Sequence, residues 1–298
     1  MLRFCFGIAA VLSGVWFGST LEIQDPLGQE PTVTAVTFLS EKGVPFLETD
    51  PSTVLVRERA KLKEVHALSP GEQQPLVLGL VLDRSGSRRE QLPDAENEPL
   101  KNFATSLLRP TDRVFLHFYS NRQIGSTETA TGSGEVSEWI NRLASNGNQG
   151  YSLLYDAMNQ AIERAKREPG RRVLVVVSDG LDNASRLQLE ELIEAAQRGG
   201  VVVHFVQVED PQMHPVARRR AGQVGNLAEA TGGAALKVRR ATDFAPALER
   251  IASLVKNQTL VHHSCEADKS GKPRSLKIGS NRKKVKVLYP KASSCTAG

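Results

Sequence analysis

A nearly unbroken apolar run occupies residues 76–82 of the chain, where every position except Gly79 is leucine or valine. A strand with one face in solvent alternates between apolar and polar residues, whereas a strand covered on both faces does not. The run therefore predicts a buried strand of the kind found in a parallel α/β sheet. The polar residues that follow it directly mark the end of this strand.

After Gln73 the pattern alternates between strand-like runs and segments with helical periodicity. The expected strands are 76–82, 114–119, 172–177, 201–208 and 235–238, with 122–127 as an antiparallel neighbour of 114–119; the expected helices are 99–108, 135–144, 153–167, 187–198, 224–231 and 244–256. Strands separated by helices at this spacing imply crossover connections. The predicted fold is a doubly wound, mainly parallel sheet with helices on both faces.

The two ends of the chain have the pattern of β-strands without helices. Residues 32–39 and 284–289 alternate between apolar and polar positions, and 44–47, 54–59, 260–263 and 275–278 are weaker strand candidates. Residues 61–68 fit either a strand or a short helix, and Ser69–Pro70–Gly71 is expected to interrupt regular secondary structure. Neither end is large enough to be stable alone, so we expect the two to pair as one small β region.

This pattern predicts four parts along the 298 residues. They are a signal peptide at 1–20, an N-terminal β segment at 21–72, a central α/β domain at 73–256 and a C-terminal β segment at 257–298. The length fits one large domain with a smaller partner.

The first twenty residues indicate export. Arg3 is followed by an apolar stretch that carries no charge before Glu22 and ends in the small residues 18–20. These features favour a cleaved signal peptide over an uncleaved anchor. No later segment has the apolarity of a membrane span, so the expected location is the periplasm, the cell envelope or the extracellular space.

The chain contains three cysteines. Cleavage of the signal would remove Cys5 and leave Cys265 and Cys295 in an oxidising compartment, where disulfides form. We expect these two to pair and close the C-terminal segment, the alternative being two unpaired thiols.

Composition and charge exclude some classes of partner. Aromatic residues make up 5% of the chain, too few for a base-stacking surface, and no base-reading motif accompanies the net charge of +5. Nucleic acid is therefore not an expected partner. The lysines of residues 269–291 and the arginines of 218–220 are interpreted as solvated faces, with weak, salt-sensitive contact to anionic envelope polymers as an alternative for the basic tail.

The candidate chemistry lies where the first buried strand ends. Asp83, Ser85 and Ser87 form a D-x-S-x-S pattern, so one carboxylate and two hydroxyls can face the same point. Oxygen ligands of this kind suit a divalent cation such as Mg²⁺. Asp179 ends the strand predicted at 172–177, and ligands of parallel sheets bind at such carboxyl ends.

Three segments together resemble the von Willebrand factor type A (VWFA) domain and its metal-ion-dependent adhesion site. They are Asp83–Ser87 (DRSGS), residues 150–157 (GYSLLYDA) and residues 175–183 (VVVSDGLDN), within a match that covers roughly residues 73–256. The flanking β segments and the export signal resemble exported bacterial proteins described as VWFA-related, common in Acidobacteria.

The resemblance implies a ligand set, carried over by position: Asp83, Ser85, Ser87, Ser152 and Asp179. In the family pattern the two serines of the first loop bind the cation directly, while the aspartates act largely through waters or through the serines. Ser152 stands where the family has threonine, so it keeps the hydroxyl and loses the methyl group that restrains the rotamer. Tyr151 stands where the family has a second glycine.

The function implied is cation-dependent protein recognition, not catalysis. Neutral hydroxyl ligands leave Mg²⁺ (or Mn²⁺ or Ca²⁺) with much of its charge and an open position for an acidic side chain of a partner protein. Two other classes remain: a metal-independent structural component of the envelope, and a hydrolase. The hydrolase lacks support because Ser85 is not in a G-x-S-x-G turn and the chain has no G-K-[ST] loop.

Several other polar residues have simpler interpretations. The D-x-S-x-S segment alone is also compatible with a capped turn at the end of a strand. Asp156 is expected to stabilise the start of its helix, and Asp182 and Asn183 to form a turn. His117 and His204 are expected to pack inside strands, and residues 262–265 (HHSC) lack the fourth ligand of a zinc site.

Overall fold

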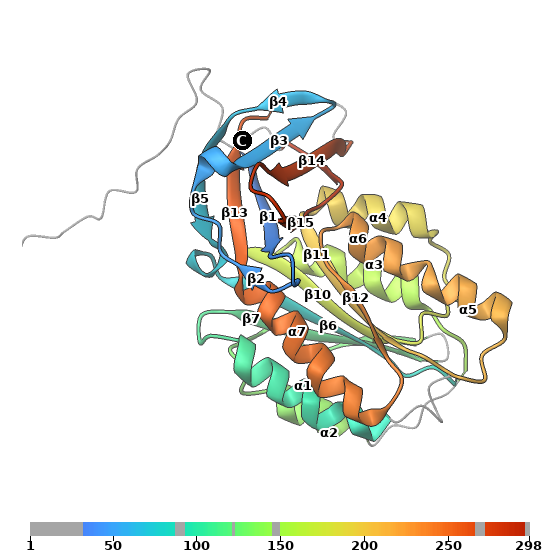
Figure 1. The fold of residues 1–298 in the computed structure, drawn as a ribbon. Helices are drawn as coiled ribbons and strands as arrows, with labels where there is room; N and C mark the ends of the chain where they lie inside the picture. The colour runs from blue at the N-terminus through green and yellow to red at the C-terminus, as the bar shows by residue number, and fades with distance from the viewer. Residues whose placement is uncertain (1–31, 87–92, 121–122, 145–149, 266–271, 296–298) are drawn as a thin grey trace, which may run out of the picture.

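The computed structural model describes residues 32–86, 93–120, 123–144, 150–265 and 272–295. The predicted signal peptide, with Cys5, and the candidate ligand Ser87 lie outside these ranges. The described part consists of a large α/β unit and two smaller sheets that lie over one end of it (Figure 1).

The α/β unit is built around a seven-stranded sheet in the order β12-β11-β10-β6-β7-β8, with β9 paired to β7. The strands are β6 (Leu76–Asp83), β7 (Arg113–Ser120), β8 (Gln123–Ser126), β9 (Ala130–Thr131), β10 (Arg171–Ser178), β11 (Val201–Val208) and β12 (Ala235–Val238). All neighbouring pairs are parallel except those that β8 and β9 make with β7. The predicted doubly wound, mainly parallel sheet is therefore confirmed.

Helices cover both faces of this sheet (Figure 1). The helices are α1 (Pro93–Leu107), α2 (Val136–Ala144), α3 (Leu154–Ala165), α4 (Leu189–Arg198), α5 (Pro215–Gly222), α6 (Val224–Ala230) and α7 (Phe244–Lys256). The side chains of β6 are buried on both faces: Leu78 and Leu80 pack with α1, α2 and α7, whereas Val77 and Val81 pack with α3, α4 and α6. This two-sided burial explains why the β6 sequence shows no alternation.

Two smaller sheets join the ends of the chain, as predicted. One has the order β15-β1-β13-β5 with β2 paired to β1, and the other has the order β16-β14-β3-β4. Their strands are β1 (Thr32–Leu39), β2 (Pro45–Phe46), β3 (Val54–Glu58), β4 (Lys61–Lys63), β5 (Val65–Pro70), β13 (Gln258–His263), β14 (Arg274–Ser280), β15 (Lys286–Leu288) and β16 (Ala292–Ser293). We call these the terminal sheets.

The terminal sheets share a small apolar core and a disulfide. The core contains Val36, Phe38, Val54, Val56, Val261, Leu276 and Ile278. The expected disulfide between Cys265 and Cys295 is present, with the two Cα atoms 6.0 Å apart. It joins the segment after β13 to the segment after β16 and so closes the C-terminal part of the chain.

The structure decides one open prediction, corrects two others and adds a helix that was not predicted. Residues 61–68 form the two strands β4 and β5 on either side of Glu64. Strand β5 continues through Pro70, so Ser69 and Pro70 do not interrupt regular secondary structure. The first helix begins at Pro93 and contains Pro99, whereas the sequence pattern predicts its start at Pro99. Helix α5 was not predicted, because Ala221 is its one buried residue and no apolar periodicity marks it.

Candidate metal-ion site

The candidate ligands lie at the carboxyl ends of β6 and β10, which are neighbours in the sheet. Leu82 of β6 pairs with Val177 of β10, so Asp83 and the Ser178–Asp179 segment leave the sheet side by side. Asp83, Ser85 and Asp179 are all buried. Asp83 and Asp179 are 96 positions apart in the sequence. Because their two strands are parallel neighbours, the sheet register alone brings them to the same edge of the sheet.

Asp83 is held by two hydrogen bonds that fix both carboxylate oxygens. The backbone N–H of Ser85 donates to Oδ1 at 2.8 Å, and the hydroxyl of Ser178 donates to Oδ2 at 2.7 Å. Tyr119 of β7 extends this chain by donating its hydroxyl to Ser178 Oγ at 3.1 Å. Burial, and then the charge of Asp83, raise the pKa of Tyr119 well above its usual value, so the phenol stays protonated and able to donate.

A backbone hydrogen bond connects the loop after β6 with the segment that precedes α3. The N–H of Gly86 donates to the carbonyl oxygen of Gly150 at 3.0 Å. Gly150 has a φ of 71°, a conformation that favours glycine. Tyr151, which stands where the family has glycine, is 53% exposed and therefore does not crowd this contact. The loop that carries Ser85 is thus tied to the segment that carries Ser152.

Ser152 connects the same segment to the loop after β10. Its N–H donates to Asn183 Oδ1 at 2.8 Å, and its carbonyl oxygen accepts from the N–H groups of Asn183 at 3.2 Å and Ala184 at 3.1 Å. The side chain is different: Ser152 is 2% exposed, and its Oγ has no hydrogen-bond partner among the residues that the structure describes. Ser152 is therefore rigidly placed with a buried hydroxyl that no described residue satisfies.

Asp179 lies at the start of a tight turn after β10. It is fully buried, and its Oδ1 accepts from the N–H of Leu181 at 2.8 Å. Gly180 follows with a φ of 85°, and a Cβ at this position would lie 2.5 Å from the carbonyl oxygen of Ala221. Glycine is thus required here by both the backbone conformation and the close approach of α5.

Asp156 and Asp182 support the surrounding loops. Asp156, at the start of α3, accepts from the backbone N–H groups of Arg186 and Leu187, and Asp182 accepts from the N–H of Ser185. The hydrogen bond of Asp182 matches its predicted turn-forming role, whereas the hydrogen bonds of Asp156 hold the segment before α4 and not, as predicted, the start of its own helix. Neither carboxylate is needed as a ligand to explain its position.

The structure therefore brings Asp83, Ser85, Ser152 and Asp179 to one edge of the sheet through direct hydrogen bonds between their segments. Their side chains offer only hydroxyl and carboxylate oxygens, which are the ligands that Mg²⁺, Mn²⁺ and Ca²⁺ prefer. The unsatisfied Oγ of Ser152 also fits a ligand at this point. The residues present thus fit a divalent cation.

Three residues of this site were not predicted from the sequence: Tyr119, Ser178 and Asn183. Asn183 had been interpreted as a turn former, but its side chain also fixes the backbone of Ser152. Ser178 precedes Asp179 and could have been found as a further hydroxyl at a strand end. Tyr119 carries no such signal, because its role depends on β7 lying next to β6.

The histidines and the zinc alternative have structural explanations. His117 and His204 are buried within β7 and β11, as predicted. His262 and His263 bond through Nε2 to the hydroxyls of Ser69 and Thr34 on neighbouring strands. Cys265 is bonded to Cys295, so it offers no thiolate to a zinc ion.

Comparison with known proteins identifies the family. The sequence profile of the von Willebrand factor type A domain matches residues 78–251, which is more than half of the chain. The chain belongs to the family of von Willebrand factor type A domain proteins. No curated protein matches the chain significantly in sequence.

Two solved structures are similar to this chain. The pilus adhesin SpaC from Lactobacillus rhamnosus GG has 14% identity and a TM-score of 0.51, over 83% of this chain and 42% of SpaC. A von Willebrand factor type A protein from Catenulispora acidiphila has 15% identity and a TM-score of 0.48, over 80% of this chain and 52% of that one. The chain thus spans about half the length of these relatives or less. Within the described residues, no helix is both long and apolar enough for a membrane span.

Proposed function

We propose that this protein binds a partner protein through a divalent cation held at the candidate metal-ion site. Asp83, Ser85, Ser152 and Asp179 would hold Mg²⁺, Mn²⁺ or Ca²⁺, together with Ser87, which lies outside the described residues. The partner would contribute an acidic side chain. The role is adhesion or protein–protein interaction in the cell envelope or outside the cell, and it is not enzymatic.

The observation that carries this proposal is the buried hydroxyl of Ser152. A buried polar group without a partner costs about 1–3 kcal/mol, so proteins rarely keep one without a use for it. This hydroxyl lies where the loops after β6 and β10 meet the segment before α3, and its backbone is fixed on both sides by Asn183. A cation bound there would give Ser152 Oγ an interaction that no described residue provides.

The hydrogen bonds of Asp83 favour a cation that keeps most of its positive charge. Both oxygens of this carboxylate already accept hydrogen bonds, from Ser85 N–H and Ser178 Oγ. Asp83 therefore acts mainly by orienting Ser85. With neutral hydroxyls as the direct ligands, a bound cation would supply an electrophilic centre for a carboxylate from outside the chain.

The comparisons support the adhesive and exported parts of the proposal. SpaC, which shares the fold, is a pilus adhesin. The N-terminal residues predict export, and the Cys265–Cys295 disulfide suits an oxidising compartment. These observations favour an adhesive protein of the cell surface over an enzyme.

The direct test is calorimetric titration of the purified protein with Mg²⁺, Mn²⁺ and Ca²⁺. We expect wild-type protein to bind at least one of these ions and Ser152→Ala to weaken binding about tenfold, since one of few ligands is lost. Because the substitution removes a buried hydroxyl that no described residue satisfies, the free energy of unfolding without metal should stay the same or rise. Ser253→Ala on α7, far from the site, is the matched control.

The functional test is recovery of partner proteins from the native envelope on immobilised protein, with and without EDTA. We expect Ser152→Ala to lose the same partners that EDTA releases. Recovery that is unaffected by both EDTA and Ser152→Ala would overturn the proposal and would favour a metal-independent structural component.

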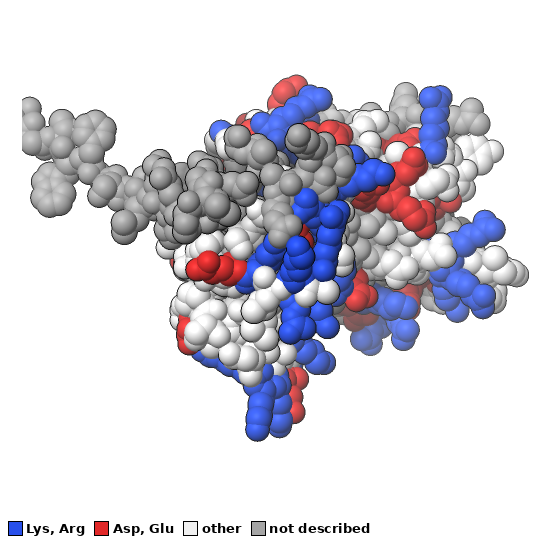
Figure 2. Space-filling model, turned by 90° about the horizontal axis from the view of Figure 1, so that it is seen from above, with Lys and Arg blue, Asp and Glu red and all other residues white. Residues whose placement is uncertain are grey.

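A second, weaker interaction is suggested by the outer surface of the terminal sheets, where Lys and Arg side chains gather near the middle of the face in Figure 2. Arg57 of β3 and Lys277 of β14 are exposed cross-strand partners, and neither has an ion pair within the described part of the chain. Like charges placed opposite each other destabilise a sheet, so this pair favours contact with an anionic polymer. Arg57→Gln with Lys277→Gln should reduce retention on an anionic polysaccharide column at low salt; unchanged retention would argue against it.

A further inference from the structure

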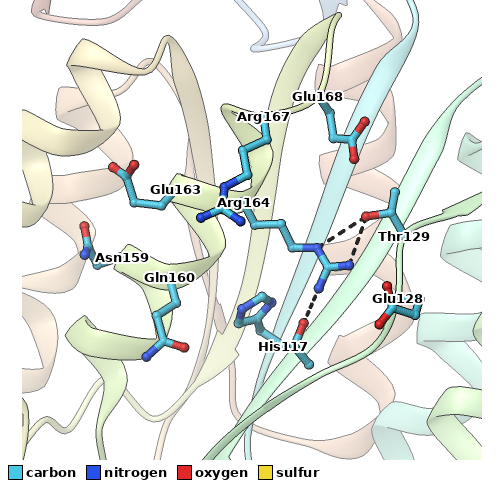
Figure 3. A pocket seen from close by; sticks show the side chains of 10 residues that line it. His117, Glu128, Thr129, Asn159, Gln160, Glu163, Arg164, Arg167 and Glu168 are labelled. Atoms are coloured by element: carbon cyan, nitrogen blue, oxygen red, sulfur yellow. Dashed lines mark hydrogen bonds between the residues drawn. The ribbon is translucent and has the colours of Figure 1, made fainter.

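A cavity of about 580 Å³ opens between α3 and the β8–β9 connection (Figure 3). Its walls come from the second half of α3 and the turn that follows (residues 159–168), from residues 126–129, and from His117 of β7. Of the candidate cation ligands that the structure describes, none lines it. The volume lies within the range of about 300–1,000 Å³ that is usual for small-molecule sites.

Two of the three acidic residues at this cavity are already paired with cations. Glu163 bonds to Lys166 at 2.9 Å, and Glu168 bonds to Arg113 at 3.0 Å. Glu128 stands on the opposite wall, and its side chain has no hydrogen bond or ion pair to any described residue. The cavity therefore has one anionic group available to a ligand.

Two guanidinium groups, one from α3 and one from the turn that follows it, also face this space, and neither bonds to a carboxylate of a described residue. Arg164 donates to the hydroxyl of Thr129 at 3.0 Å and to that of Ser126, and it lies over the ring of Phe115, 4.9 Å from the centroid. The side chain of Arg167 has no hydrogen bond or ion pair within the described ranges. Figure 3 shows Arg167 beside Arg164 on the helix side of the cavity. Adjacent guanidiniums without a carboxylate form a receptor for an anionic group.

His117 supplies a buried hydrogen-bonding group at the base of the cavity. The residue is 4% exposed, and its Nδ1 has no partner among the described residues. Its ring packs edge-on against Phe115, with the centroids 5.4 Å apart. Burial, and then the charge of Arg164, lower the pKa of His117 to about 4, so the imidazole is neutral at neutral pH. An unsatisfied buried nitrogen at a cavity wall indicates a missing polar ligand.

The arrangement of these groups defines the kind of ligand. A simple anion would leave Glu128 unused, and a simple cation would leave Arg164 and Arg167 unused. Burial lowers the pKa of Arg164, and the nearby charge of Glu128 acts in the opposite direction, so the two walls are close enough to interact although they are not bonded. A molecule that carries both charges a few ångströms apart satisfies both walls.

We propose that this cavity binds a small zwitterion of the α-amino-acid type, with its carboxylate at Arg164 and Arg167, its ammonium group at Glu128 and a polar atom at His117 Nδ1. The ligand is either a free amino acid or a short peptide, since both carry these charges. Asn159 and Gln160, which also line the cavity, offer amide groups to the remainder of such a ligand.

The test is a titration of the full chain with glycine, L-glutamine and the dipeptide Ala-Ala, followed by calorimetry and by the NMR signals of the His117 ring. Each probe is compared with its N-acetyl and C-amide derivatives, which lack one of the two charges. We expect the zwitterion to bind about tenfold more tightly than either derivative. Binding of Ala-Ala but not of the amino acids would identify the ligand as a short peptide.

Matched variants assign the two charges. Arg167→Gln should weaken binding of the zwitterion about tenfold, so that the zwitterion and its C-amide derivative bind with equal affinity. Glu128→Gln should make the affinities of the zwitterion and of its N-acetyl derivative equal. Both residues are exposed, so the fold should persist, and Arg220→Gln and Glu249→Gln on other exposed helix faces are the controls. Binding should be the same in EDTA, which separates this cavity from the candidate metal-ion site.

Three outcomes would overturn the proposal. They are no binding of any zwitterion at about 10 mM, a concentration at which even weak small ligands are detected; equal binding of the singly charged derivatives; or equal effects of the cavity variants and the control variants.

Discussion

The central α/β unit and the terminal sheets are stabilised in different ways. In the α/β unit, the parallel strands β6, β7, β10 and β11 are joined by helical crossovers, and buried apolar clusters lie on both faces. In the terminal sheets, strands from opposite ends of the chain pair with each other, as β1 does with β13 and β3 with β14. The small core of these sheets is supplemented by a disulfide and by buried charges.

The buried charges centre on Glu58 of β3. Its carboxylate bonds to Arg274 at 3.2 Å and to Lys63 at 3.4 Å, with all three side chains at least nine-tenths buried. A small region with little apolar core generally needs a covalent or ionic link to be stable. The difference indicates that the terminal sheets depend on a few specific links, whereas the α/β unit depends on many similar apolar contacts.

The two regions also lie at opposite ends of the same strands. Arg171, at the start of β10, donates to Val255 O and to Gln258 Oε1 of β13, while the candidate metal-ion site begins at Ser178, where β10 ends. Eight strand residues place these two points roughly 23 Å apart. We therefore expect changes in the terminal sheets to leave cation binding largely intact.

The largest expected effect is that of Glu58→Gln. It removes the charge that compensates Lys63 and Arg274, and breaking a buried ion pair from one side costs about 3–5 kcal/mol. Urea denaturation measures the loss, and hydrogen exchange should locate it in β3 and β14. Glu41→Gln, which removes an exposed ion pair with Lys284, is the control and should cost less than about 1 kcal/mol. Equal effects of the two variants would remove the proposed distinction between the regions.

The next effect is that of removing the disulfide with Cys265→Ser and Cys295→Ser. The bond spans 30 residues of sequence, and a loop of this size contributes about 3–4 kcal/mol through the unfolded state. We expect the urea midpoint to fall while the affinity for the cation stays within twofold of wild type. A loss of cation affinity in step with stability would show that the regions are coupled.

An acid-dependent effect is expected in the α/β unit. His204 is fully enclosed in β11, accepts a hydrogen bond from the N–H of Ala234 at its Nδ1, and has its pKa lowered from 6.5 to about 4 by burial. The unfolded chain therefore binds a proton below pH 6.5 that the folded chain does not take up until about pH 4. Stability should fall as the pH decreases through this window, by up to roughly 3 kcal/mol.

His204→Asn tests this assignment, because an amide oxygen can accept the same hydrogen bond and does not titrate. The slope of unfolding free energy against pH between 6.5 and 4 should become shallower in this variant than in the wild-type protein. An unchanged slope in His204→Asn would place the acid sensitivity elsewhere.

The smallest effect is expected for Tyr119→Phe next to the candidate site. Ser178 Oγ keeps its bonds to Asp83 and to the N–H of Gly180, so one hydrogen bond is lost and stability should fall by about 1 kcal/mol. Cation affinity should change less than twofold, because Asp83 keeps its hydrogen bonds from the N–H of Ser85 and from Ser178 Oγ. A tenfold loss would show that Tyr119 fixes the geometry of Asp83.

Local patterns predicted elements well where side-chain periodicity is strong. The bounds of β11, β12 and α7 agree with the predicted ranges. Helix α5 was missed because its surface is almost entirely polar, and residues 61–68 stayed ambiguous because β4 and β5 are half-exposed edge strands. Periodicity reports burial, so elements with little buried surface leave little signal.

The sequence alone determined the fold class, the strand ends at which Asp83 and Asp179 lie, and the pairing of the chain termini, because these follow from local apolar patterns and short motifs. Only the tertiary structure decided that Tyr119 and Ser178 hold Asp83, that Asn183 fixes Ser152, and that Arg164, Glu128 and His117 enclose one cavity. These residues lie on separate strands, loops and helices, and no periodic pattern encodes their contacts. Such contacts arise when strand order and helix packing bring distant segments together.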